Sequence, residues 1–305
     1  MTKTITGICP IVAATFTAGG RLDEDSFQGL VRHLMGTGAH ALTLFGLATE
    51  FYKLTDGERE TMQRILLAET TAHPVVAGIV SITDHSWEVA VLRARRAQHG
   101  GADALMVLPP YFLAPAEEAI IEHIARVAAV VEIPVIVQYA PAQTGVRLAP
   151  TVFLDLAAAC PNVSFVKVET QPPGRYISAL LERGAGRLAT LVGYAGVQMP
   201  DVLARGAAGV QPGCSFTELY VALWRLWREG DGAGMRALHA RMLPYIGYWM
   251  QGIELIIQAE KTILQRRGII AHDYCRAPGY NLDAMERDMV GAFLGEFAPL
   301  LKHEA

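Results

Sequence analysis

The chain has 305 residues, of which 51% are hydrophobic and 18% charged, and its formal net charge is -4. This composition is that of an ordinary globular protein with a large core, and it excludes disordered and collagen-like proteins. Neither a basic stripe nor an apolar run of about 18 residues is present, so we expect no nucleic-acid partner and no membrane span.

The cysteines and the first residues bear on the compartment. Cys9, Cys160, Cys214 and Cys275 are few and widely spaced, which is not the pattern of a disulfide framework. Residues 1–6 lack the apolar core of a secretion signal. We therefore expect a cytoplasmic protein.

Short apolar runs alternate with amphipathic helical stretches along the chain. The expected strands are Gly7–Thr15, Ala41–Gly46, Val75–Ile79, Ala104–Leu108, Val135–Tyr139, Val163–Val168, Leu188–Gly193 and Ala208–Pro212. The expected helices include Asp25–Thr37, Thr55–Thr71, Asp84–His99, Pro115–Val131, Pro150–Ala159 and Thr217–Glu229. Thr55, with Glu58 three residues later, predicts a capped helix start.

Eight strands, each followed by a helix, predict an α/β fold, a (β/α)8 TIM barrel over residues 1–230. Residues 231–305 are expected to form a C-terminal helical extension. A doubly wound open sheet is the alternative. That fold would normally carry a glycine-rich phosphate-binding turn after its first strand, and this chain has none there.

Lys167 lies near the end of an otherwise apolar expected strand. Side chains alternate along a strand, so Val163, Phe165 and Lys167 are expected to share the inner face, near the catalytic mouth of the barrel. Burial disfavours a charged ammonium and favours a neutral, nucleophilic amine, the group that forms Schiff bases with carbonyl substrates. The structural alternative is a lysine paired with Glu169 on the same face.

Four segments in order carry a family resemblance. These are Gly46–Thr55, Gly101–Phe112, Pro134–Gly145 and Phe165–Glu169. They resemble the Gly-Thr-Thr-Gly-Glu loop, the Pro-Tyr-Tyr motif, the fifth strand and the Schiff-base lysine of the pyruvate-dependent class I aldolases, the family of dihydrodipicolinate synthase and N-acetylneuraminate lyase. The resemblance implies a (β/α)8 fold, a 2-oxo acid bound as an imine at Lys167, and a homodimer or homotetramer. It implies no cofactor.

The resemblance also implies where the substrate binds. Ala48 and Thr49, in the loop after the second strand, are expected to bind the substrate carboxylate through backbone N–H groups and the Thr49 hydroxyl. Tyr111, Gly193 and Val210, at the ends of later strands, complete the expected substrate-binding set.

The chain departs from the family pattern at the proton relay. The relay tyrosine of the fifth strand aligns with Gln138, and the relay threonine and second tyrosine align with Leu47 and Phe112. The arginine that binds a second carboxylate in the synthase aligns with Gln143. Each change removes a hydroxyl or an ionisable group, so dihydrodipicolinate synthesis itself is disfavoured.

Proton transfer therefore needs another group. Gln138 can orient a water molecule or bind an oxygen, but it is neither an acid nor a base. Tyr139 is a candidate with Tyr111, a bound water or the substrate carboxylate, although Tyr139 points to the opposite face unless a bulge turns it.

These observations predict a lyase of the class I aldolase type that acts on a 2-oxo acid, with pyruvate as product or donor. Aldol cleavage and dehydration both remain open. The alternative from another class is a non-catalytic keto-acid sensor. No histidine pair has metal-ligand spacing, so a zinc-dependent aldolase is disfavoured. The segment Leu191–Ala195 contains no acidic residue, which disfavours a sialic-acid substrate.

Three further charged residues have expected structural roles. Glu50 is expected to anchor the loop after the second strand rather than to titrate in the reaction. Lys53 is expected to be solvated, and Lys261 to be a helix residue that can pair with a carboxylate.

Overall fold

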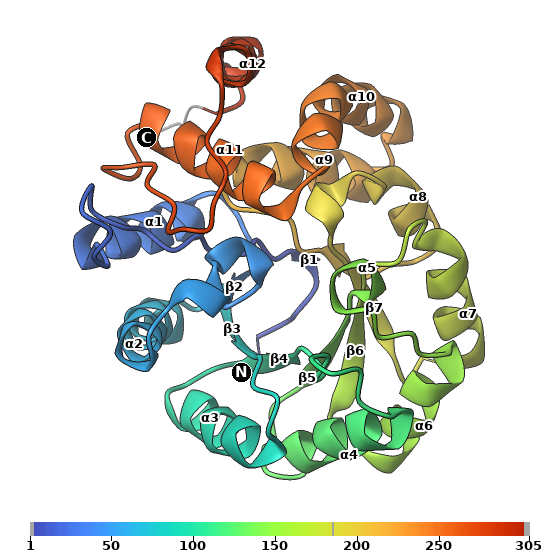
Figure 1. Cartoon of the computed structure of the whole chain (residues 1–305). Coiled ribbons are helices and arrows are strands. Elements are labelled where there is room, and N and C mark those ends of the chain that lie inside the picture. Colours follow the sequence, from blue (N-terminus) through green and yellow to red (C-terminus); the bar gives the residue numbers. More distant parts are fainter. Residues whose placement is uncertain (1–2, 185, 302–305) are drawn as a thin grey trace.

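The computed structural model describes residues 3–184 and 186–301. Its centre is an eight-stranded parallel sheet in the order β1-β8-β7-β6-β5-β4-β3-β2, with helices around it (Figure 1). The strands are β1 (Gly7–Ile8), β2 (Ala41–Leu44), β3 (Ala77–Ile82), β4 (Ala104–Val107), β5 (Val135–Tyr139), β6 (Val163–Val168), β7 (Ala189–Val192) and β8 (Gly209–Val210). The predicted TIM barrel is confirmed.

The barrel closes between β1 and β2 through backbone contacts that follow the short regular part of β1. Ile11 forms parallel bridges to both Thr43 and Gly213. The amide of Thr43 donates to the carbonyl of Pro10 at 2.9 Å. The regular part of β1 ends at Ile8, earlier than predicted, although the amides of Cys9 and Ile11 still donate to the carbonyls of Val210 and Pro212.

The surrounding helices are α1 (Glu24–Gly36), α2 (Asp56–Ala72), α3 (Trp87–His99), α4 (Glu117–Ala128), α5 (Pro141–Thr144), α6 (Pro150–Ala159), α7 (Gly174–Gly184), α8 (Met199–Ala204) and α9 (Thr217–Arg228). Short 3-10 helices follow two strands: η1 (Leu47–Thr49) and η2 (Phe51–Lys53) after β2, and η3 (Tyr194–Gly196) after β7. The predicted cap of α2 is confirmed, since Thr55 and Glu58 form a capping box.

The start of β3 differs from the prediction. The strand begins at Ala77 rather than Val75, and Val75 is 64% exposed. The amides of Val75 and Val76 donate to Nδ1 of His73, so these residues belong to a turn.

The core has two layers. The barrel interior is filled by a small cluster: Ile5, Cys9, Ala41, Ala77, Ile79, Ala104, Met106, Ile136 and Leu191, with Phe165 packed against it. The larger cluster lies between the strands and the helices and includes Val163, Val166 and Val168. Val163 therefore does not share the inner face with Lys167, and that prediction is wrong.

A bulge explains the position of Val163. Val135 of β5 pairs with Val163, whereas the next residue, Ile136, pairs with Phe165. Ser164 is thus an extra residue in β6, and it shifts the alternation by one position. From Phe165 onward the predicted alternation holds, so Lys167 points into the barrel.

Three helices follow the barrel: α10 (Gly232–Trp249), α11 (Ile253–Arg266) and α12 (Ala284–Phe297). The first turns of α11 lie beside η1, which brings the C-terminal part of the chain to the mouth of the barrel (Figure 1). None of the described helices is both long and apolar enough to cross a membrane.

Candidate active site

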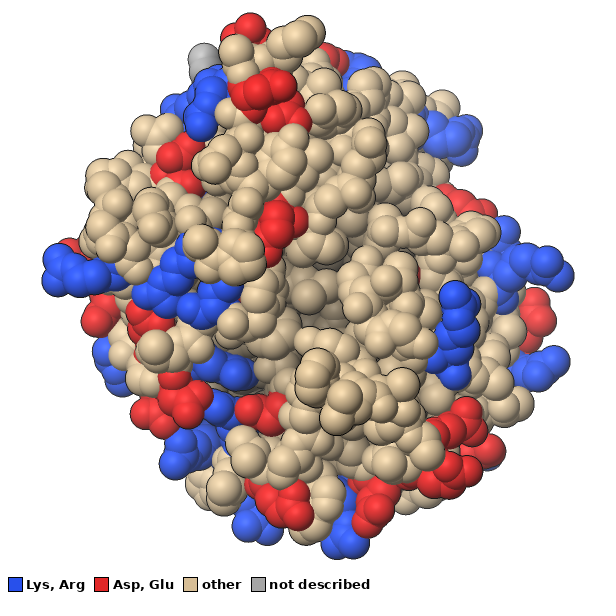
Figure 2. Space-filling view, viewed as in Figure 1, with Lys and Arg blue, Asp and Glu red and all other residues tan. Residues whose placement is uncertain are grey.

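A cavity of about 60 Å³ lies at the carboxyl ends of the strands. It is several times larger than the roughly 10–15 Å³ that holds one water molecule. Figure 2 shows a hollow near the middle of this face, with most charged side chains gathered toward the rim. The polar residues of the cavity wall are Gln138, Gln143, Lys167, Glu169, Tyr194, Gln211 and Glu260.

Lys167, Glu169 and Gln138 form a connected group in this cavity. All three are more than nine-tenths buried. Lys167 Nζ lies 3.4 Å from Oε1 of Glu169, and Gln138 Nε2 donates to Oε2 of Glu169 at 2.7 Å. The two carboxylate oxygens therefore face different partners, so the carboxylate is held in one orientation beside the amine.

Gly193, at the end of β7, makes room for this carboxylate. A Cβ at position 193 would overlap the side chain of Glu169, including Oε1 and the carboxyl carbon. Gly193 was predicted to bind substrate. That role stays a prediction, and the structure adds that the lack of a side chain at this position allows Glu169 to lie beside Lys167.

Helix α11 forms an apolar side of the cavity. Ile253, Ile256 and Ile257 line it together with Met250, which precedes the helix. Glu260 follows on the same face, one turn after Ile256, and is 3% exposed. Burial raises the pKa of the Glu260 carboxyl to about 7.

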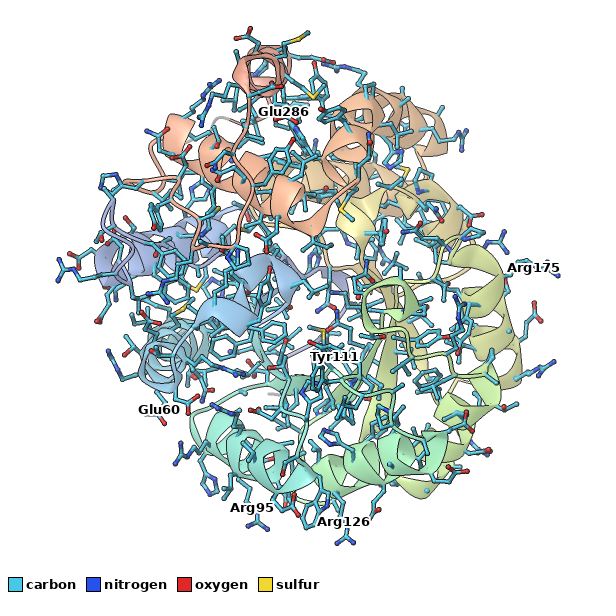
Figure 3. The ribbon with its side chains drawn as sticks, viewed as in Figure 1. Glu60, Arg95, Tyr111, Arg126, Arg175 and Glu286 are labelled. Carbon is cyan, nitrogen blue, oxygen red and sulfur yellow. The ribbon has the colours of Figure 1, made fainter. Side chains whose placement is uncertain are left out.

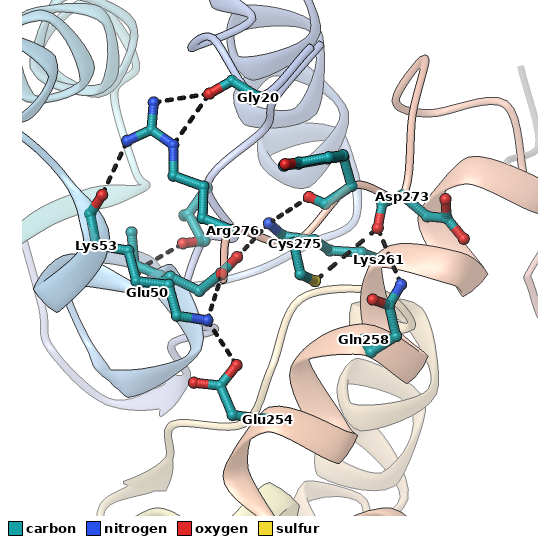
Figure 4. A network of polar contacts seen from close by, with 12 residues as sticks. Gly20, Glu50, Lys53, Glu254, Gln258, Lys261, Asp273, Cys275 and Arg276 are labelled. Carbon is teal, nitrogen blue, oxygen red and sulfur yellow. Dashed lines mark hydrogen bonds and ion pairs between the residues drawn. The ribbon is translucent and has the colours of Figure 1, made fainter. Parts of the chain in front are cut away.

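A buried ion-pair network joins α11 to the loop after β2 (Figure 4). Glu50 is fully buried and pairs with Lys261 through Oε1 and with Lys53 through Oε2. Lys53 also pairs with Glu254 at 2.6 Å. The predicted anchoring role of Glu50 and the pairing of Lys261 are confirmed.

The prediction that Lys53 is solvated is wrong. Its side chain is 4% exposed because it is enclosed between Glu50 and Glu254. Its carbonyl also accepts from Arg276, which binds the carbonyl of Gly20 in turn. Arg276 thus ties the loops after β1 and β2 to the segment that follows α11.

The two residues predicted to bind the substrate carboxylate have different positions. Ala48 lines the cavity, as does Leu47 beside it. Thr49 is buried, and its hydroxyl donates to the carbonyl of Val12 at 2.7 Å. That hydroxyl is therefore engaged in holding the loop and does not face the cavity.

Tyr139 lies on the outer face of β5. Its ring packs against Phe153 of α6 and Tyr176 of α7, at centroid distances of 5.4 and 4.9 Å. Its hydroxyl accepts from the amide of Leu148 at 3.2 Å. The bulge lies in β6 and does not turn Tyr139, so a proton-relay role for this residue does not fit the structure.

The remaining predicted residues lie outside the cavity wall. Tyr111 is half-buried in the loop after β4, beside His85, and lies over the barrel mouth in Figure 3. Val210 is fully buried in the outer core layer. Its side chain packs between the strands and the helices and does not line the cavity.

Glu260 is the main site residue that the sequence interpretation missed. The available signal was a carboxylate that continues the spacing of Ile253, Ile256 and Ile257 on an apolar helix face. Gln211, which donates to the Thr43 hydroxyl at 2.9 Å, was also missed.

The cavity therefore offers a buried amine, an oriented carboxylate beside it, an amide and a second carboxyl on α11. This combination suits imine formation followed by proton transfer. Within the described residues, His, Cys, Asp and Glu form no cluster of three that could hold a metal ion.

Comparison with known proteins identifies the family of the chain. The model of the dihydrodipicolinate synthetase family matches residues 4–296. The chain belongs to this family and is a lyase of the class I aldolase type.

Its relatives differ in the reaction that they catalyse. L-2-keto-3-deoxyarabonate dehydratase of Azospirillum brasilense is 29% identical over 97% of this chain and 95% of its own. The probable 2-dehydro-3-deoxy-D-pentonate aldolase YjhH of Escherichia coli is 26% identical over 96% and 97%. The crystal structure of dihydrodipicolinate synthase from Rhodopseudomonas palustris shares the fold, with a TM-score of 0.87 at 24% identity over 97% of this chain and 99% of that chain.

Proposed function

We propose that the protein is a Schiff-base-forming dehydratase that removes water from a 2-keto-3-deoxy acid. The observation that carries this proposal is the position of the Glu169 carboxylate, 3.4 Å from Lys167 Nζ and fixed by Gln138. A base at that position is close to the carbon next to the imine.

The first step forms the imine. Lys167 Nζ attacks the C2 carbonyl, and the carbonyl oxygen leaves as water, which gives an iminium that acts as an electron sink. The N–H groups of Leu47 and Ala48 begin η1 and are not used in its internal bonds, so they are available to the substrate carboxylate.

The second step removes the C3 proton. Glu169 takes this proton, and the C–H electrons form an enamine. The enamine then expels the C4 hydroxyl with its bonding electrons, and the oxygen takes up a proton and leaves as water, which is balanced when Glu169 releases the C3 proton to solvent. Hydrolysis of the unsaturated iminium consumes one water and frees Lys167, so the net change is the loss of one water.

Two observations favour dehydration over aldol cleavage. Cleavage of the C3–C4 bond needs a base at the C4 hydroxyl, and Gln138 stands where the family pattern has its relay tyrosine. Glu169 instead lies beside the amine, where it suits a C3 proton. The likeness to the Azospirillum dehydratase over nearly the whole chain supports the same choice.

Trapping and product analysis test this proposal. Pyruvate plus borohydride should add a reduced adduct at Lys167, detected by intact mass and peptide mapping, and Lys167→Arg should abolish it. Lys3→Arg is the matched control, since Lys3 is paired with Asp103 and does not line the cavity.

The wild-type protein should then convert 2-keto-3-deoxy pentonates or hexonates into dehydrated 2-oxo acids. Proton NMR of the reaction mixture measures this conversion. Release of pyruvate would identify an aldolase instead. An adduct without turnover would identify a keto-acid binder, and no adduct at Lys167 would overturn the imine mechanism.

A further inference from the structure

Glu260 is a second buried carboxyl in the cavity that the steps above leave without a role. It lies on α11, one turn after Ile256, at a position where the helix otherwise presents isoleucines to the cavity. A carboxyl is costly to bury at such a place unless its polar atoms are satisfied. Its contacts therefore need an explanation.

The backbone after β8 binds this carboxyl on one side, and hydrogen bonds from the amides of Cys214 and Ser215 partly offset the effect of burial on its pKa. Oε2 accepts from the amide of Cys214 at 2.9 Å, just after β8. Among the residues that the structure describes, Oε1 has no hydrogen-bond partner, although it is buried. One oxygen is thus held by the backbone, and the other is left for a group that occupies the cavity.

Gly213 provides the space for this carboxyl. A Cβ at position 213 would overlap both oxygens of Glu260, so any side chain there would expel the carboxyl from its place. In the same way, a Cβ at position 193 would overlap the carboxyl of Glu169. Two carboxyls of the cavity thus occupy space that a glycine at a strand end leaves open.

We propose that Glu260, in its protonated form, is the general acid that protonates the C4 hydroxyl as it leaves. This inference rests on the proposed dehydration. As the C4–O bond breaks, the oxygen keeps the bonding electrons and takes the proton from Oε1, which forms water and leaves Glu260 as a carboxylate. Glu169 then releases the C3 proton to solvent and Glu260 takes up an equivalent proton, so both groups are restored and the C3 proton and C4 hydroxyl have left together as water.

The order of the strands places the proposed base, Glu169, and the proposed acid, Glu260, on different sides of the cavity. Lys167 and Glu169 enter the cavity from the β6 side, whereas Glu260 lies against Gly213 at the end of β8. Strand β7 separates these two strands. A substrate joined to Lys167 through C2 therefore presents C3 to Glu169, and the hydroxyl two carbons from the imine can extend toward Glu260.

The protonation state agrees with this role. Burial raises the pKa of Glu260 to about 7, so the acid form is present at and below neutral pH. The titratable groups around it are Cys214 and Tyr220, whose pKa values burial raises far above 7, and Lys261, whose ammonium is paired with Glu50. In the cavity, Glu169 is paired with Lys167. In the described part of the chain, Glu260 has no ion-pair partner.

The variant Glu260→Gln tests this role, because the amide keeps the shape and can still accept from Cys214 but cannot deliver a proton. We expect the rate of water loss to fall by about 100-fold, as is typical for the loss of a general acid. Borohydride trapping of pyruvate at Lys167 and C3 deuterium exchange should persist. The fall in wild-type kcat/KM above about pH 7 should disappear in the variant.

A fluorinated substrate separates acid catalysis from a structural effect. A fluorine substituent is similar in size to a hydroxyl, but it departs as fluoride and does not need to be protonated. The rate of fluoride release from 4-fluoro-2-oxobutanoate should therefore fall less than threefold in Glu260→Gln. The matched control is Glu182→Gln, the same change at an exposed position of α7 outside the cavity wall, which should leave both reactions near the wild-type rate.

The outcomes distinguish the two proposals. Equal losses for water and fluoride in Glu260→Gln, or an unchanged rate of water loss, would overturn the acid role while the dehydratase stands. If wild-type protein removes water from no 2-keto-3-deoxy acid, the proposed function fails and the role of Glu260 fails with it.

Discussion

The carboxyl of Glu169 occupies the space that a side chain at Gly193 would fill. This close approach joins the first residues after two neighbouring strands, since β6 ends at Val168, β7 ends at Val192, and the two strands pair. The orientation of the carboxylate beside Lys167 therefore depends on a residue that has no polar side chain.

The substitution Gly193→Ala should reduce turnover. The added methyl group must displace the Glu169 carboxyl, which moves the base away from Lys167 and breaks its bond from Gln138. Removing a positioned base typically costs about 10²–10⁴-fold, so we expect a fall of at least tenfold in kcat, measured with a 2-keto-3-deoxy acid that the wild type dehydrates.

The matched control for this substitution is Gly247→Ala in α10. A Cβ at position 247 would meet open space. Alanine is favoured over glycine in a helix by about 0.5–1 kcal/mol, so this variant should be as active as the wild type and slightly more stable. An active Gly193→Ala enzyme would contradict the placement of Glu169.

The substitution Glu169→Gln should separate imine formation from proton removal. The amine of Lys167 remains, so pyruvate should still be trapped by borohydride. The pyruvate methyl protons should exchange with D2O about 100-fold or more slowly, because no base is left beside the imine. NMR measures this exchange rate. Exchange at the wild-type rate would assign proton removal to another group.

The substitution Lys261→Met should destabilise the fold strongly. Glu50 would keep Lys53 but lose the cation on its other oxygen, and it is fully buried. Removing one partner of a buried ion pair costs roughly 3–5 kcal/mol, which urea unfolding would measure.

A second substitution tests the cause of that loss. Adding Glu50→Gln to Lys261→Met should recover part of the stability, because the uncompensated charge is gone. The surface pair Arg96–Glu60 provides a comparison, since both side chains are more than 60% exposed. Arg96→Met should cost less than about 1 kcal/mol. Equal losses in the two single variants would argue against a buried network.

The stability of the protein should depend on pH through Glu260. Its pKa is raised from 4.5 to about 7 in the folded state, so the folded protein holds a proton that the unfolded chain has released over this interval. Stability from this group is therefore fully present below about pH 4.5 and is lost as pH rises through 7.

Glu260→Gln cannot ionise, so it should be more stable than the wild type above pH 7, by an amount on the order of 3 kcal/mol. Urea unfolding at about pH 5 and pH 8 measures the difference. Glu296→Gln, a substitution of a carboxylate on the exposed face of α12, should show no comparable pH dependence. Parallel pH curves for wild type and Glu260→Gln would contradict the buried acid.

Much of the barrel side of the site was predictable from local pattern. The apolar run of β6 and its alternation placed Lys167 inside the barrel and Glu169 on the same face. The same rule predicted that Tyr139 faces away from Gln138. It failed at Val163, because one extra residue in a strand reverses the alternation and leaves no mark in composition.

The residues that were misjudged depend on contacts distant in sequence. Lys53 resembles a solvated loop residue until Glu254, far along the chain, encloses it. The Thr49 hydroxyl is diverted to the carbonyl of Val12. Glu260 belongs to the cavity only because α11 docks against η1, and no local pattern predicts that docking.

The docking of α11 also determines at which stage of synthesis the cavity wall can be complete, because this helix follows all eight strands in the chain. Strand β6, which carries Lys167, emerges from the ribosome well before α11, and the helix that brings Lys261 to Glu50 also brings Glu260 to the cavity. A nascent chain that has already formed its barrel strands therefore carries an amine in an open, water-filled mouth. The cavity wall is therefore complete only after α11 has docked.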